Sequence, residues 1–362
     1  MSWPTWLPLR ETLRPLSPYG APQVPAVASL NTNENPYSPS PSLQKAITDA
    51  VAKVAADLNR YPDRDATILR TKLANYINEG SGTDFTLDNI WAANGSNEII
   101  QSIFLAFAQG PVLGFTPSYS MHPLIAKTTG SQWIDGKRNA DFSLNTADAV
   151  AEVIKNKPTL TFVTTPNNPT GDSVTIDAIH ELADAAKQVG GLLVVDEAYA
   201  EFSQEVSAVT LVANNPHVIV IRTMSKAFAF AGARLGYLVS DVAVKDAMMI
   251  VRLPYHLSAF TQAAALAALS HSELMLSAVA DIRVQRDRII AELIEMDLDP
   301  YRSDSNFVLF GGVDSPKDVW QQLLERGVLV RDVDIEGTLR VTAGTEAETT
   351  LFLDNLREVL KG

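Results

Sequence analysis

The sequence predicts an α/β protein: a large α/β/α domain built on a mixed, mostly parallel sheet, together with a smaller α+β domain. Between residues 90 and 240, short and almost continuously apolar runs alternate with amphipathic segments. This alternation is typical of parallel strands buried between two layers of helices. After Ser272 the pattern changes and longer helical segments predominate. A chain of 362 residues also has room for two domains of about 150 residues each.

The strands expected in the large domain are short apolar runs followed by turns or polar residues. They cover residues 90–93, 111–115, 160–165, 192–195, 218–223 and 235–240. Helices are expected between them, from the turn at 94–97 through Phe107 and again at 176–189. Helical spacing of apolar residues supports the second of these helices.

The two ends of the chain have different patterns. Residues 1–40 contain eight prolines, which disfavours regular structure and predicts an extended arm that packs on another part of the protein. We expect Trp3 and Trp6 to anchor this arm. Helices are predicted at 42–58, 65–77, 274–296, 316–326 and 346–360, and strands at 307–310, 328–330 and 339–342.

These patterns divide the chain into three parts. We expect an N-terminal arm over residues 1–40, a large domain over 41–265 and a small C-terminal domain over 266–362. The arm is expected to join the small domain in part, so that this domain is discontinuous in sequence.

Composition excludes several classes of function. The chain has 29 Lys and Arg against 42 Asp and Glu, a net charge of −13, which argues against nucleic-acid or membrane partners. It has no cysteine, so thiolate catalysis and disulfides are excluded. No basic and apolar leader and no apolar run of membrane-spanning length is present, so a cytoplasmic protein is expected. The five histidines lack metal-ligand spacing, and no metal is expected.

Polar residues follow four of the expected strands, at 94–97, 167–171, 196–199 and 223–226. Each segment alone is more typical of a helix cap, a turn or a surface pair. Together they lie where ligands bind in open α/β sheets, beyond the carboxyl ends of the strands. Ser96 opens a helix after Gly95 and thus predicts a phosphate cradle, to which Ser225 and Arg234 would add contacts.

Lys226 and Asp196 point to the chemistry. Lys226 precedes the apolar run AFAFA, and a partly desolvated lysine has a lowered pKa and attacks carbonyl groups. Asp196 ends a buried strand, and its carboxylate needs a cationic partner, which a protonated pyridine nitrogen would supply. Asn168 and Tyr199 could then bind a phenolate oxygen on that ring, and Tyr119 could stack on its face.

Four segments in this order resemble the fold-type-I pyridoxal-phosphate aminotransferases: NNPTG at 167–171, DEAY at 196–199, SKAF at 225–228 and AGARLGY at 231–237. Further segments resemble the histidinol-phosphate aminotransferases within that group. These are LNTNENPY at 30–37, RYPD at 60–63, ANGSNE at 93–98, RD at 331–332 and LR at 339–340.

The resemblance implies pyridoxal 5′-phosphate as cofactor and a role for each matching residue. Lys226 would hold the cofactor as an internal aldimine, Asp196 would pair with the pyridine nitrogen, and Tyr199 and Asn168 would contact the ring oxygen. The remaining cofactor-binding residues would be Ser96, Asn97, Tyr119, Ser225, Arg234 and the partner subunit's Tyr61 in a homodimer. The substrate side would be formed by Tyr19, Asn33, Arg331 and Arg340.

The implied reaction is a ping-pong transamination between histidinol phosphate and 2-oxoglutarate, giving imidazole acetol phosphate and L-glutamate in histidine biosynthesis. Arg340 would bind the glutamate carboxylate and, with Arg331, the phosphate of histidinol phosphate. The alternatives are an aromatic amino-acid aminotransferase, a phosphothreonine-type decarboxylase and a non-enzymatic pyridoxal-phosphate-binding regulator. For His256, both a position facing the active site and a purely structural role remain open.

Overall fold

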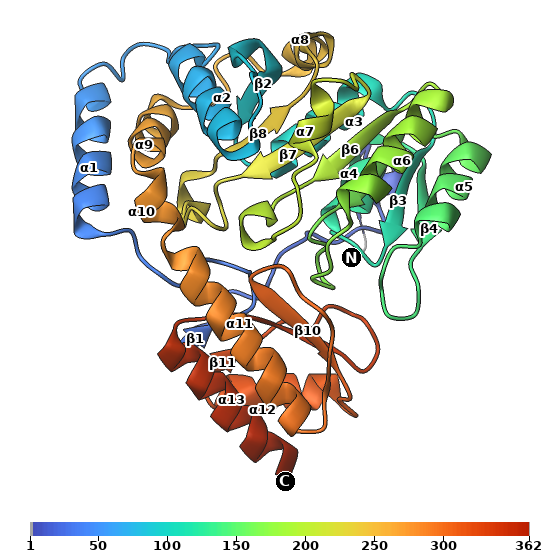
Figure 1. Cartoon of the computed structure of the whole chain (residues 1–362), viewed down its shortest axis with the longest axis vertical. Helices are drawn as coiled ribbons and strands as arrows, with labels where there is room; N and C mark the ends of the chain where they lie inside the picture. The colour runs from blue at the N-terminus through green and yellow to red at the C-terminus, as the bar shows by residue number, and fades with distance from the viewer. Residues whose placement is uncertain (1–2, 362) are drawn as a thin grey trace.

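The computed structural model describes residues 3–361, and its centre is a sheet of seven strands (Figure 1). The strand order is β2-β8-β7-β6-β5-β3-β4. Strand β8 runs antiparallel to both of its neighbours, whereas the other described strands of the sheet share one direction. The bounds are β2 (Ile90–Ala93), β3 (Val112–Thr116), β4 (Trp133–Lys137), β5 (Leu160–Thr164), β6 (Leu192–Asp196), β7 (Val218–Thr223) and β8 (Gly236–Val239).

The central strands are largely apolar because both faces of the sheet are covered. Alternate residues of a strand point to opposite faces, so Val194 belongs to one apolar cluster while Leu193 and Val195 belong to the other. One cluster lies under α3 (Ser96–Phe107), α4 (Met121–Thr129) and α8 (Val242–Val251). The other lies under α2 (Thr67–Ser81), α5 (Thr146–Asn156), α6 (Ile176–Gln188), α7 (Val209–Val212) and α9 (Ala259–Leu269). The predicted α/β fold class is confirmed.

A smaller α+β unit is formed by the C-terminal part of the chain (Figure 1). Strand β10 (Phe307–Gly311) pairs antiparallel with β12 (Leu339–Thr342) and β9 (Asp299–Pro300). Helices α11 (Ala278–Glu295), α12 (Pro316–Glu325) and α13 (Glu346–Lys361) accompany these strands. Strand β1 (Ala28–Ser29) of the arm pairs parallel with β11 (Val328–Leu329) of this unit.

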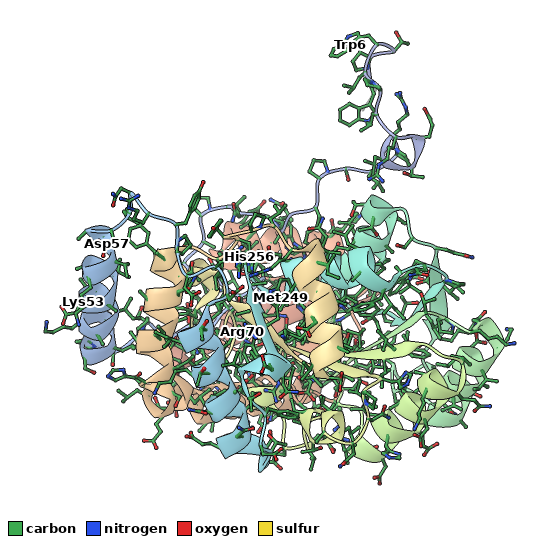
Figure 2. The ribbon with its side chains drawn as sticks, turned by 90° about the horizontal axis from the view of Figure 1, so that it is seen from above. Trp6, Lys53, Asp57, Arg70, Met249 and His256 are labelled. Carbon is green, nitrogen blue, oxygen red and sulfur yellow. The ribbon has the colours of Figure 1, made fainter. Side chains whose placement is uncertain are left out.

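The beginning of the arm extends away from the rest of the protein (Figure 2). The side chain of Trp3 donates a hydrogen bond to the carbonyl of Arg14 at 3.1 Å, inside the arm itself. Trp6 is 78% exposed, so within the described residues it does not anchor the arm to this chain. Helix η1 (Glu11–Leu13) lies in this segment, and α1 (Pro41–Ala55) begins after the arm, with Ser40 as its N-cap.

The structure differs from the sequence-based elements in a few places. The predicted helix over 274–296 consists of α10 (Ser272–Leu276) and α11, separated by Ser277, which keeps helical angles (φ −56°, ψ −35°). Strand β4 was not predicted, because its polar Asp135 and Lys137 suit the edge of a sheet and interrupt the apolar pattern. Among residues 3–361 no single helix is long and apolar enough to cross a bilayer, and α9 with residues 272–295 reaches that length only across an 84° bend.

Candidate active site

A cavity of about 490 Å³ opens at the carboxyl ends of the parallel strands, where the arm and β12 meet the large sheet. Thirteen of the fourteen predicted site residues line it, and Tyr61 does not. The thirteen are Tyr19, Asn33, Ser96, Asn97, Tyr119, Asn168, Asp196, Tyr199, Ser225, Lys226, Arg234, Arg331 and Arg340.

Asp196 is a buried carboxylate at the end of β6, only 2% exposed. Its Oδ2 lies 3.1 Å from Nε2 of His122, a residue of α4 that is 1% exposed. The amide N–H of Ala198 donates to Oδ1 at 3.3 Å. A buried carboxylate that borders a cavity and has one imidazole behind it is suited to a cationic ligand group in front of it.

Sequence reasoning did not identify His122 as a site residue. The imidazole is held between the rings of Tyr119 and Phe162, with centroids 5.4 and 4.8 Å away. The one available signal was its position three residues after Tyr119, in the segment that follows β3. Its contact with Asp196 depends on how α4 packs on the sheet, which residue spacing does not encode.

Lys226 lies in the loop that follows Thr223, the last residue of β7. Its Nζ donates to the carbonyl of Thr32 at 2.8 Å and lies 5.8 Å from the ring centroid of Tyr199. Burial, assisted by the nearby positive charge of Arg340, lowers the pKa of Lys226 to about 8. The following Ala227 and Phe228 are buried and supply the apolar wall that the sequence predicted.

The predicted phosphate cradle lies at the start of α3, where the end of β2 and the start of β8 approach each other closely. Gly95, with φ 82°, precedes α3, and no side chain caps the first turn of this helix. A Cβ atom on Gly236 would lie 2.5 Å from the amide nitrogen of Ser96, and one on Gly95 would lie 2.6 Å from a guanidinium nitrogen of Arg234. The backbone contact at Gly236 leaves no room for a side chain, and the positive φ of Gly95 favours glycine there. Free amides at a helix start beside a guanidinium suit a phosphate group.

The aromatic and amide side chains in the cavity hold one another. The hydroxyl of Tyr119 donates to Oδ1 of Asn97 at 3.1 Å. The hydroxyl of Tyr199 accepts hydrogen bonds from Nδ2 of Asn33 at 3.0 Å and from Nδ2 of Asn168 at 3.4 Å. Burial raises the pKa of both tyrosines, so both are protonated at neutral pH.

Two arginines lie on the small-domain side of the cavity. Arg331 and Arg340 exchange backbone hydrogen bonds of 2.9 Å in both directions. The Arg340 guanidinium donates to the Asn31 carbonyl at 2.8 Å and lies 5.0 Å from the ring centroid of Phe307. Burial lowers the pKa of Arg340 to about 10 despite the nearby Tyr199 hydroxyl, so this guanidinium stays charged at neutral pH.

Tyr61 and His256 lie outside the cavity. Tyr61 is 79% exposed and stacks on Tyr255, with ring centroids 4.3 Å apart. A nitrogen of His256 lies 2.9 Å from the carbonyl of Ala92, and its ring stacks on Trp91. His256 therefore ties its loop to β2, which is the structural alternative left open by the sequence. Among the described residues no group of three His, Cys, Asp or Glu side chains could hold a metal ion.

The fold and the cavity define a class of enzyme. A lysine of lowered pKa, a buried aspartate and an anion cradle fit the three reactive parts of pyridoxal 5′-phosphate: its carbonyl, its ring nitrogen and its phosphate. This is the arrangement of a fold-type-I pyridoxal-phosphate enzyme.

Comparison with known proteins agrees. The family described as "Aminotransferase class I and II" matches residues 25–356. The chain is 52% identical to the histidinol-phosphate aminotransferase of Paenarthrobacter aurescens, over 98% of this chain and 96% of the relative. It is 51% identical to that of Mycolicibacterium smegmatis, over 96% and 92%. The histidinol-phosphate aminotransferase of Sinorhizobium meliloti in complex with pyridoxal-5′-phosphate superimposes with a TM-score of 0.83 at 25% identity, over 93% and 92%. The chain belongs to the class I and II aminotransferases, in the histidinol-phosphate aminotransferase family.

The close approach at Gly236 yields a prediction. Gly236→Ala should weaken pyridoxal-phosphate binding at least about tenfold, because the new methyl group displaces the Ser96 amide and one hydrogen bond to a charged group contributes about 1.5–3 kcal/mol. Fluorescence titration of the apoprotein measures this affinity. Gly232→Ala is the matched control, since a Cβ there meets no atom within 4 Å. Binding of pyridoxal, which lacks the phosphate, should be unchanged in both variants. If Gly236→Ala and Gly232→Ala bound pyridoxal phosphate with equal affinity, the assigned phosphate cradle would be contradicted.

Proposed function

We propose that the chain catalyses the pyridoxal-phosphate-dependent transfer of an amino group between histidinol phosphate and 2-oxoglutarate. The products are imidazole acetol phosphate and L-glutamate, and the reaction belongs to histidine biosynthesis in the cytoplasm. The observation that carries the proposal is the pairing of Arg331 with Arg340 beside Lys226 and Asp196 in one cavity. The two half-reactions of such an enzyme bind different anions, and two arginines supply both sites.

When bound, pyridoxal phosphate supplies a carbonyl that takes up the amino group and a ring that accepts electrons. Lys226, with a pKa of about 8, is partly neutral near neutral pH. Its Nζ would therefore be the nucleophile that holds the cofactor and, when free, the base that moves the substrate's Cα proton. The short link to the Thr32 carbonyl orients this amine toward the cavity.

The other residues fix the cofactor and its charges. Asp196, oriented by its contact with His122, would hold a proton on the ring nitrogen. Tyr199 and Asn168 would bind the ring oxygen, and the Tyr119 ring would stack on the cofactor; all three line the cavity. The phosphate would be bound at the start of α3 and by the loop after β7, through Ser96, Asn97, Ser225 and Arg234, which all line the cavity.

The substrates enter from the side of the arm and the small domain. The guanidinium of Arg340 binds the carboxylate of glutamate, since a planar fork of donors matches a planar carboxylate. Arg331 joins it when the anion is the phosphate of histidinol phosphate. Tyr19 and Asn33, which both line the cavity, complete the substrate side.

A panel of amino donors tests this function. We expect kcat/KM to be higher for histidinol phosphate than for phenylalanine or tyrosine. Arg331→Ala should lower kcat/KM for histidinol phosphate about thirtyfold or more, and that for glutamate much less, because losing one partner of a desolvated charge pair costs about 2–5 kcal/mol. Arg302→Ala is the control, since Arg302 is 73% exposed and pairs with Asp304. Equal losses on both substrates, or a preference for aromatic donors, would contradict the proposed substrate.

We further propose that the enzyme is a homodimer in which Tyr61 binds the cofactor phosphate of the partner subunit. The loop that carries Tyr61 lies beside the loop that follows α8, since Arg252 donates to the carbonyl of Arg64. The two loops and the adjoining helix ends expose apolar side chains, which is typical of a protein–protein interface. These side chains are Leu58, Tyr61, Ile68, Ile250, Leu253 and Tyr255. The exposed Trp6 on the projecting arm is a further candidate contact.

Mixed dimers test the role of Tyr61. A subunit with Lys226→Ala and one with Tyr61→Ala should both have little activity as homodimers at limiting cofactor. Their purified heterodimer should regain about half of the wild-type activity, since in a two-fold dimer one of its two sites contains both residues. A heterodimer no more active than its parents would contradict a role for Tyr61 across the interface.

A further inference from the structure

Strand β12 places two buried side chains on the same face, toward the cavity. Arg340 and Thr342 are two residues apart, so their side chains point in one direction from the strand. They are 6% and 2% exposed. Each donates a hydrogen bond to the side-chain oxygen of an asparagine: Arg340 to Oδ1 of Asn168, and Thr342 to Oδ1 of Asn33 at 3.1 Å.

The hydroxyl of Thr342 fixes the direction of its hydrogen bonds. Its oxygen accepts the backbone N–H of Asn33 at 3.0 Å. A hydroxyl has a single proton, which is then donated to Oδ1 of Asn33. The Asn33 backbone is itself held in place, because its carbonyl accepts Nδ2 of Asn306 at 3.1 Å. The amide of Asn33 is thus locked with Oδ1 toward Thr342 and Nδ2 toward Tyr199.

Tyr199 receives hydrogen bonds from both asparagines. Since the amide oxygens of Asn33 and Asn168 are occupied by Thr342 and Arg340, their Nδ2 groups point to the Tyr199 hydroxyl, at 3.0 and 3.4 Å. A phenol oxygen accepts about two hydrogen bonds and donates one. Within residues 3–361 no acceptor lies within hydrogen-bonding distance of the Tyr199 proton, and Tyr199 lines the cavity. Its own proton is therefore available to a ligand in the cavity.

We propose that Thr342 is a positioning residue that locks the Asn33 amide, so that the Tyr199 hydroxyl donates its hydrogen bond to the ring oxygen of the bound cofactor. This inference rests on the proposed function, which places Tyr199 at that oxygen. Thr342 does not line the cavity and acts through Asn33. Without the Thr342 hydroxyl, the Asn33 amide is free to turn over and to take the Tyr199 proton on Oδ1.

The consequence is electronic. A ring oxygen that accepts a hydrogen bond from Tyr199 is a weaker acceptor for the proton on the nitrogen that joins Lys226 to the cofactor. The Tyr199 hydrogen bond therefore lowers the pKa of that nitrogen, and loss of the lock raises this pKa. The small domain, through β12, thereby influences the protonation state of the cofactor linkage on the large domain.

The experiment is a pH titration of the visible absorbance of the holoenzyme, which reports the pKa of the linking nitrogen. Thr342→Val removes the hydroxyl at nearly constant shape and should raise this pKa by about half to one unit, since one hydrogen bond contributes about 0.5–1.5 kcal/mol. Thr342→Ser should restore the wild-type value. Asn33→Ala should leave this pKa near the wild-type value, because it removes the amide oxygen that could take the Tyr199 hydrogen bond. Thr342→Ala removes the same hydroxyl and serves if Thr342→Val does not load cofactor.

Two controls separate positioning from structural damage. Thr349→Val is the matched substitution, since Thr349 is fully buried in α13 and its hydroxyl has no partner in the described part of the chain. It should leave the pKa unchanged. In a Tyr199→Phe background, Thr342→Val should cause no further shift, because no phenol proton remains to be directed.

An unchanged pKa in Thr342→Val, or the same shift with and without Tyr199→Phe, would overturn the role of Thr342 while leaving the proposed function intact. A wild-type protein that neither transaminates nor shows a titrating cofactor band would overturn the proposed function and this inference together.

Discussion

The ladder of hydrogen bonds between the parallel strands β5, β6 and β7 is the constraint on which the site depends. It sets Thr164 beside Asp196 and Asp196 beside Ile221. Backbone bonds continue just past the strand ends, from Glu197 to Ile221 and from Thr165 to Asp196, both at 2.9 Å. A shift of register by one residue would turn Asp196 to the opposite face of the sheet. The loop that carries Lys226 leaves the next strand two residues further on.

A buried ion cluster on the other face stabilises these strand ends. Arg222 of β7 pairs with Glu197 and Glu201 at 2.9 Å each. Glu197 also accepts the amide of Ala208 at 2.6 Å, and Asp196 precedes it directly. Removing one member of such a cluster leaves a buried charge without its partner, which costs several kcal/mol. The position of Asp196 thus depends on contacts on both faces of the sheet.

The cavity also depends on the arm and the small domain. The arm supplies Asn33 and the carbonyl that accepts from Lys226, and β12 supplies Arg340 and Thr342. The amide of Asp304 donates to the carbonyl of Gly171 at 2.8 Å, linking the two domains beside Asn168. If Arg340 binds the substrate's anion and Thr342 acts on Tyr199 as proposed, β12 would couple substrate binding to cofactor protonation.

Sequence reasoning reached the fold class and the cavity for one physical reason. Parallel strands end at the same edge, so polar residues after each apolar run were expected to meet, as Asp196 and Lys226 do. The direction of β8 was not predictable, because an apolar run reads the same in either direction.

Contacts between residues that are distant in the sequence could also not be predicted from it. His122 reaches Asp196 only through the packing of α4, and Thr342 reaches Asn33 across 309 positions of the chain. The roles proposed for the individual site residues, and the exchange of Tyr61 between subunits, remain predictions.

The central claim is that Lys226 carries the cofactor. Reduction of the holoenzyme with borohydride, followed by proteolysis and mass spectrometry, tests it most directly, because reduction converts the linkage into a stable pyridoxyl group on the lysine. The account predicts one labelled peptide per chain, with the mass increase on Lys226. A label on a different lysine, or no label on a protein saturated with pyridoxal phosphate, would contradict it.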